Sequence, residues 1–231
     1  SAVNEATVGK DGDYTIEGGS VAVESTGSGH YLTVGDASGK RARRSITVGG
    51  MIIPFEPANV VTANSTGVGA GIAVGLVGVD VTARIEDGVR FKGLPMTSAL
   101  VNASYHGTEH IEAAAGAAGG TSVVPVLALG VGGVYTQAYL GSAADETLSL
   151  TGDLAVTAAG QVERTMQVDA AAVGAGVGVG GAFGIGVFND SAAADLERAA
   201  NAASVLVDAQ SISRFDQKVI ASAKGATPTT S

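Results

Sequence analysis

Residues Val173–Val187 read VGAGVGVGGAFGIGV, with branched or aromatic side chains at most odd positions and glycine at nearly every even position. A period of two predicts a β-strand. A strand face in contact with water would carry polar residues, whereas this second face carries almost no side chains, so another layer has to lie close to it. With the valines pointing into the fold, the glycines would form an outer wall. We expect that wall to support close packing, either of a second layer of the chain or of neighbouring subunits in a fibre.

The composition predicts a thin β structure. The 231 residues are 45% hydrophobic and include 35 glycines, but only 4% are aromatic and none is tryptophan. Alanine, valine, isoleucine and leucine fill a narrow core well and a broad one badly. The uncharged segment Ala170–Phe188 is long enough for a membrane helix. We expect a strand instead, because each of its seven glycines would cost roughly 1 kcal/mol inside a helix.

Charge and cysteine content exclude several classes of function. The formal net charge of −9 argues against nucleic acids and anionic membrane surfaces as partners, since both are bound through clustered lysine and arginine. The chain has no cysteine, which removes disulfides, thiolate metal sites and cysteine nucleophiles. It begins at Ser1 without an initiator methionine or a signal segment, so it reads as a processed product or an excised fragment.

A pattern of about 53 residues repeats along the chain. A glycine-alternating run, a polar alternating strand and an aliphatic strand follow one another three times. The polar strands begin at or near Val79, Val134 and Val187, and the aliphatic strands contain Leu100, Leu154 and Leu206. Units of this size cannot bury their own faces, so they have to stack on one another, and this predicts a parallel β-helix or β-solenoid. Two coils of roughly 25 residues per unit, each rising ~4.8 Å, would suit this fold, giving nine coils and a rod about 40 Å long. The branched residues change from even to odd positions near Val77, which predicts an extra residue between two strand segments.

The predicted fold is one all-β solenoid domain over residues 1–224. Its parts are a partial first unit at 1–34, an insertion or cap at 35–64, repeats at 67–120, 121–174 and 175–224, and a linker or tail at 225–231. The first unit follows from the likeness of Tyr14–Glu24 to Ser149–Thr157. Alanine-rich Ser191–Ser204 predicts a short helix near the C-terminus.

The chain resembles the repeat region of leukotoxin-type filamentous bacterial adhesins. The resemblance rests on the glycine run Gly174–Gly186, the strand Val134–Gly141 and the strand Gly152–Ala158, and it covers about Gly67–Gly225 together with Tyr14–Glu24. It implies a secreted β-solenoid on a bacterial cell surface, with adhesion or spacing as its role. The family supplies no catalytic residues.

Four motifs suggest chemistry, but each has a simpler interpretation. The sequence HGTEH at His106–His110 matches a zinc-peptidase pattern, yet on a strand its histidines would lie ~13 Å apart, too far to share one ion. The glycines Gly176, Gly178 and Gly181 satisfy a dinucleotide-binding pattern that requires a turn and a helix, which the alternation does not allow. Two charged sets remain open hypotheses: Asp11, Asp13 and Glu17 for calcium, and Lys40–Ser45 as a processing site or a patch for acidic partners.

We therefore expect a non-enzymatic structural or adhesive segment, with no catalytic, cofactor or metal residues. We expect it to self-associate end to end or laterally, or to bind a host surface or glycan, without nucleic acid binding or membrane insertion. One alternative is a polysaccharide lyase or hydrolase on a β-helix scaffold, but no charged residue lies between Glu112 and Asp145. A second alternative is a membrane-inserting or pore-forming protein.

Overall fold

A computed structural model describes residues 1–9, 14–38, 45–48, 51–54, 66–92, 96–143 and 146–224. All regular structure in these ranges is β-strand, and all but one of the strand pairings are parallel, which confirms the all-β prediction. The strands are β1 (Ala2–Val8), β2 (Thr15–Glu17), β3 (Ser20–Ser38), β4 (Ser45–Val48), β5 (Met51–Pro54), β6 (Thr66–Val68), β7 (Gly71–Ile85), β8 (Arg90–Lys92), β9 (Ser98–Leu140), β10 (Leu148–Ser149), β11 (Asp153–Phe188), β12 (Ser191–Leu196), β13 (Ala200–Asn201) and β14 (Ser204–Lys224).

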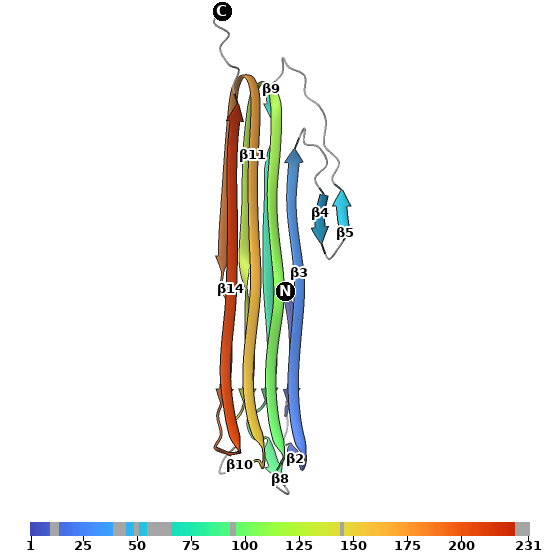
Figure 1. Cartoon of the computed structure of the whole chain (residues 1–231), viewed down its shortest axis with the longest axis vertical. Coiled ribbons are helices and arrows are strands. Elements are labelled where there is room, and N and C mark those ends of the chain that lie inside the picture. The colour runs from blue at the N-terminus through green and yellow to red at the C-terminus, as the bar shows by residue number, and fades with distance from the viewer. Residues whose placement is uncertain are drawn as a thin grey trace, which may run out of the picture.

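Two layers of long strands are formed because β9 and β11 each bend and return. In Figure 1 these ribbons run the length of the molecule, fold over at the upper end and descend behind themselves. The first halves of β9 and β11 lie between β3 and β14, and we call this the front layer. The second halves pair with each other and with β6, β7 and β12, and we call this the back layer. The bend in β11 coincides with a shift in register between Gly174 and Val177.

The repeat predicted from the sequence is present as strand register, but one unit makes one pass over both layers. Arg164 pairs with Glu109, 55 residues earlier, in the front layer. The prediction of two short coils per unit is therefore wrong, and so is the nine-coil rod. The long axis follows the strands, and a layer of about 22 residues at ~3.3 Å per residue is roughly 70 Å long.

Strand pairing places β3, from the proposed first unit, beside the later units. Val23 of β3 and Val156 of β11 both pair with Val101 of β9, as their sequence likeness requires. One landmark was misaligned in the third unit, because Val187 pairs with Val131 and not with Val134.

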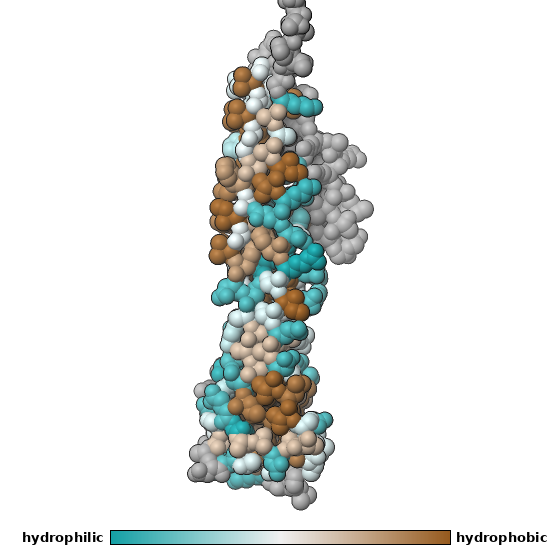
Figure 2. Space-filling model, turned by 60° about the vertical axis from the view of Figure 1, so that its left-hand side comes forward, coloured by the Kyte–Doolittle hydropathy of each residue, from teal (hydrophilic) through white to brown (hydrophobic). Residues whose placement is uncertain are grey.

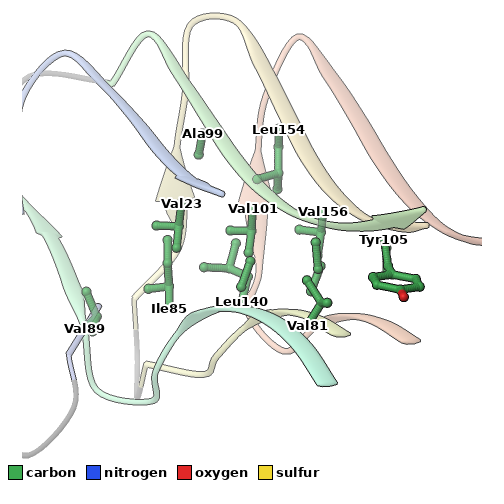
Figure 3. Packing of buried hydrophobic residues seen from close by; sticks show 14 of the residues in the cluster. Val23, Val81, Ile85, Val89, Ala99, Val101, Tyr105, Leu140, Leu154 and Val156 are labelled. Atoms are coloured by element: carbon green, nitrogen blue, oxygen red, sulfur yellow. The ribbon is translucent and has the colours of Figure 1, made fainter. Parts of the chain in front are cut away.

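The core consists of two clusters of different thickness. In the half of the molecule next to β8 and β10, branched side chains fill the space between the layers. Figure 3 shows Val101 and Val156 of the front layer pointing toward Val81 and Leu140 of the back layer. Nearer the bend the buried residues are mainly alanine, valine and glycine, with Met166 among the few large ones. The two layers therefore converge toward the bend.

The glycines of the alternating runs point inward, so the predicted outer glycine wall is wrong. A Cβ built on Gly67 or Gly71 would lie 2.6 Å from a backbone oxygen of the front layer. Gly130 leaves room for the tip of Ile111, whose Cδ1 would lie 2.6 Å from an added Cβ. Of the two kinds of close packing expected for the glycines, the structure shows the one within the chain.

The branched residues of the same runs point outward. Val68, Ile72 and Leu76 are 65–71% exposed, and their counterparts on β11 are 50–66% exposed. Farther down β7 the branched residues occupy inward positions, as Val79 and Val81 show. The register of β7 with β9 is unbroken from Gly71 to Ile85, so the predicted extra residue near Val77 is absent and the branched residues change face instead.

The alanine-rich helix predicted at Ser191–Ser204 is also wrong. Residues 191–196 form β12, which pairs in register with Tyr135–Leu140 of β9, and Ala200–Asn201 form β13. Pairing with a preformed strand edge outweighs the small helix preference of alanine. In the predicted insertion, β4 and β5 form an antiparallel pair, and the predicted tail at 225–231 lies outside the described residues.

Candidate functional site

The most concentrated group of charged side chains lies inside the fold, between the layers. Arg164 is 2% exposed, and its Nε donates to Glu109 Oε2 at 3.1 Å. Its Nη1 and Nη2 donate to the two carboxylate oxygens of Asp190 at 2.5 and 2.8 Å. Asp190 also accepts from Ser213 Oγ at 2.6 Å and from the backbone N–H of Val134 at 2.9 Å. This buried charge cluster joins β9, β11, β14 and the turn before β12.

The electrostatics of the cluster match an ion pair held in place. Burial alone would raise the pKa of Asp190, but the hydrogen bonds from Arg164 and Ser213 outweigh it, and the pKa lies below its usual value. Burial raises the pKa of Glu109, despite the pairing with Arg164. Burial would lower the pKa of Arg164, and its two carboxylate partners raise it instead. Arg164 therefore stays charged at any pH at which the fold persists.

We interpret the buried charge cluster as structural. The guanidinium lies 4.3 Å from the centroid of the Phe188 ring, and that ring packs edge-on against Phe215 at 5.3 Å. The three charged side chains are at most 5% exposed, so a substrate has no path to them. The sequence motifs did not predict this cluster. Because Glu109 and Arg164 are one repeat apart, aligning the units would have placed the opposite charges side by side.

A second buried cation fixes the turns at the lower end. Arg198 Nε donates to the carbonyl oxygen of Gly141 at 2.6 Å, and Nη1 donates to that of Val89 at 3.0 Å. Its guanidinium also lies 5.0 Å from the centroid of the Phe91 ring. Burial lowers the pKa of Arg198 below its usual value. Arg198 thus joins three turns that are far apart in the sequence.

The HGTEH motif lies on strand β9, as the alternating residues on either side of it predicted. His106 and His110 occupy positions of the same parity on the outer face of the front layer. His110 Nδ1 is 2.6 Å from Thr165 Oγ1, and its Nε2 is 3.7 Å from Glu112 Oε2. Over the described ranges, no three histidine or acidic side chains come close enough together to hold a metal ion.

The other motifs are placed as follows. Gly176, Gly178 and Gly181 lie within the continuous strand β11, without the turn and helix of a dinucleotide site. Asp11 and Asp13 lie outside the described residues, and only Glu17 of that set is seen, on β2. Of Lys40–Ser45 only Ser45 is described, at the start of β4.

An open groove of about 480 Å³ crosses the outer side of the back layer. Its floor consists largely of glycine and backbone at Gly78, Gly132 and Gly133, and Tyr135 and Asn189 flank it. No cluster of titratable side chains converges on it among the described residues that line it, so it has no evident catalytic chemistry.

The most exposed element is β14, at one edge of the front layer. All 21 of its residues are exposed, and within the described chain it pairs only with β11. Its inward positions carry apolar side chains such as Val205, Val207 and Phe215. Figure 2 shows groups of apolar side chains among polar ones on the face that includes this edge. Edges of this kind are templates for pairing with another strand.

No family model, curated protein or solved structure matches the chain. In the described part of the chain, no helix has the length and hydrophobicity needed to cross a membrane.

Proposed function

We propose that the chain is a self-associating structural or adhesive segment of a bacterial β-solenoid, secreted and displayed at the cell surface, without enzymatic activity. The fold is the first support. Successive units pair in parallel, at an offset of 78 residues for Ser98 on Ser20, where the insertion intervenes, and then at 55 residues for Arg164 on Glu109 and 51 residues for Ser204 on Asp153. One pass over both layers per unit is the geometry of a flattened solenoid. The bacterial surface setting rests on the motif resemblance described above.

The observation that carries the self-associating role is the open edge of β14. Every earlier front strand pairs with the next unit along its length, as β9 does with β11 from Leu154 to Gly174. Strand β14 has the same length and alternation, and its outer edge is free of pairing within the described chain. An edge of 21 residues with apolar inward side chains can accept another strand in the same register.

The matching edge is β3, at the other side of the front layer. Val21 of β3 pairs with Ala99 of β9, Ala99 pairs with Leu154 of β11, and Leu154 pairs with Val205 of β14. Val21 and Val205 therefore lie at the same level on the two outer strands of the front layer. Val23 and Val207 align in the same way through Val101 and Val156. A second copy that places β3 on β14 would therefore stack valine on valine.

Negative-stain electron microscopy over a concentration series tests this proposal. Edge stacking predicts ribbons about 70 Å wide that lengthen with concentration, with strands perpendicular to the ribbon axis and a fibre-diffraction spacing of ~4.8 Å along it. The double variant Val207→Lys/Val219→Lys puts charges at inward edge positions and should abolish the ribbons. Gln210→Lys adds a charge to the outer face of the same strand and should leave them intact. Single particles of the unmodified chain at every concentration would reject the self-associating role.

A further inference from the structure

The outer side of the back layer, next to the bend, is covered by branched and aromatic side chains. We call this surface the apolar outer face. Its exposed members are Val68, Ile72, Val74, Leu76, Val123, Leu127, Val131, Val177, Val179, Phe183, Ile185 and Val187. They come from β6, β7, β9 and β11, which are adjacent in one parallel sheet. Figure 2 shows apolar side chains following one another down the upper left edge of the molecule.

Register arranges these side chains in rows across the sheet. Ile72, Leu127 and Phe183 pair in one row. A second row is formed by Leu76, Val131 and Val187 in the same way, with further rows between and beyond them. The rows recur every two residues, about 6.6 Å apart along the strands. The result is a flat, ordered surface, unlike the scattered apolar residues that any protein exposes.

The apolar outer face carries no charge. The segments 66–76, 121–132 and 176–188 contain no acidic or basic residue. The outer side of the front layer is different, because it carries polar ladders such as Thr157 on Asn102 and His110 on Thr165. A charged ligand has nothing to pair with on the apolar outer face, so its partner has to be apolar as well.

The size of the face is sufficient for a stable dimer. With roughly half of each of the twelve side chains exposed, it presents on the order of 1,000 Å² of apolar surface, above the ~800 Å² per partner of a standard protein interface. Monomeric proteins rarely leave contiguous apolar patches larger than a few hundred Å² in water.

A second copy of the chain fits this face better than a lipid surface does. Two flat aliphatic sheet faces pack by interdigitation about 10 Å apart. In lipid, by contrast, the free edge of β11 at Val177–Phe188 would leave backbone N–H and C=O groups without hydrogen bonds, since this segment pairs only with β9 within the described residues.

We propose that two copies of the chain dock through their apolar outer faces, back layer against back layer, around a twofold axis. The inference deepens the self-association proposed above, and it rests on that proposal only for its biological setting. The contact itself is a separate one, because it uses the outer surface of the back layer and leaves the edge of β14 free for stacking.

Sedimentation velocity over a concentration series, on the soluble fraction of the chain, tests this contact. Leu127 lies in the middle strand of the face, so Leu127→Lys places a charge at the centre of the docked surface. A twofold dimer contains the substitution twice, and we expect its dissociation constant to rise ~100-fold or more. The matched control Gln161→Lys introduces the same charge on the outer face of the front layer, also in a central strand, and should leave the dimer unchanged.

A second variant covers the case in which Leu127→Lys does not fold. Ile72→Thr/Phe183→Thr keeps β-forming residues on either side of Leu127 but removes apolar area, so it should also weaken the dimer. A chain that is monomeric up to its solubility limit would overturn the inference. A dimer that both face variants leave unchanged would do the same, as would loss of the dimer on adding uncharged phosphatidylcholine vesicles that bind the chain.

The two self-association proposals fail separately. The edge variant Val207→Lys/Val219→Lys should lose the ribbons and keep the dimer, whereas Leu127→Lys should lose the dimer and keep single-layer ribbons. If the edge variant loses the dimer instead, the assembly assigned to the apolar outer face belongs to the edge and the inference is wrong.

Discussion

Substituting single inward glycines tests the claim that the layers touch near the bend. In Gly71→Ala the new Cβ would lie 2.6 Å from the carbonyl oxygen of Ala114, closer than real Cβ contacts allow. Ala114 cannot move away freely, because its strand pairs with β3 on one side and with β11 on the other. Overpacking of this kind typically costs about 1–3 kcal/mol. We therefore expect Gly71→Ala to lower the free energy of unfolding by that amount.

Gly160→Ala is the matched control. Gly160 is also buried and inward-facing, but the nearest atom to an added Cβ is Thr136 Oγ1 at 3.5 Å, an ordinary contact distance. Where the native conformation accepts alanine, replacing glycine stabilises a protein by about 0.4–1 kcal/mol, because the unfolded chain loses freedom. The two variants should therefore change stability in opposite directions.

Urea unfolding followed by far-ultraviolet circular dichroism measures both effects. With an m-value of about 3 kcal/mol/M, the midpoint of Gly71→Ala should fall by roughly 0.3–1 M, and that of Gly160→Ala should rise by roughly 0.1–0.3 M. If Gly71→Ala raises the midpoint, or if both variants shift it alike, the layers do not touch at this point and our account of the glycine runs is wrong.

Three further predictions concern the buried charge cluster. Arg164→Met leaves buried carboxylates without their cation and should lower the free energy of unfolding by about 3–5 kcal/mol. The control Arg214→Met, at an exposed ion pair, should change the free energy of unfolding by less than about 0.5 kcal/mol. Equal effects of the two variants in urea unfolding would contradict the structural role of the cluster. The lowered pKa of Asp190 means that its ionised form stabilises the fold above its usual pKa of about 3.9, and this contribution is lost as the pH falls through the lower folded-state value. The stability difference between the unmodified chain and Asp190→Asn should therefore shrink as the pH falls below about 4. The raised pKa of Glu109 has the opposite sign, because its ionised form is disfavoured in the fold. The free energy of unfolding of Glu109→Gln, measured relative to the unmodified chain, should therefore fall as the pH is lowered, and a relative stability that instead rises on acidification would show that the assigned pKa direction is wrong.

The all-β class and the repeat could be predicted because both depend on local pattern and spacing. The likeness of Tyr14–Glu24 to Ser149–Thr157 placed Val23 and Val156 on the same ladder position of β9, as the structure shows. The coil length could not be obtained in this way. The bend in β9 lies at the glycine pair Gly119–Gly120, a common turn signal, but the similar pair Gly180–Gly181 lies inside an unbroken part of β11. In segments this rich in glycine, the sequence therefore does not mark where a strand changes layer.

The charge cluster and the strand β12 were missed for different reasons. Glu109 and Arg164 look like ordinary surface charges until the 55-residue register places one beside the other. The segment Ser191–Leu196 has helical composition, but its backbone groups pair with a strand edge that becomes available only after β9 has formed. In both cases the deciding contact joins residues that are far apart in the chain.

The direction of the glycine runs shows what periodicity can and cannot decide. Alternation establishes that the two faces of a strand differ, and burial of apolar surface then favours the branched residues as the inner face. That preference holds at Val79 and Val81, where the facing layer is held away by side chains such as Val101. It fails at Gly67 and Gly71, because there the facing backbone occupies the space that a side chain would need. The branched residues of the run are then forced outward, and the apolar surface that they expose becomes buried only when another apolar surface covers it.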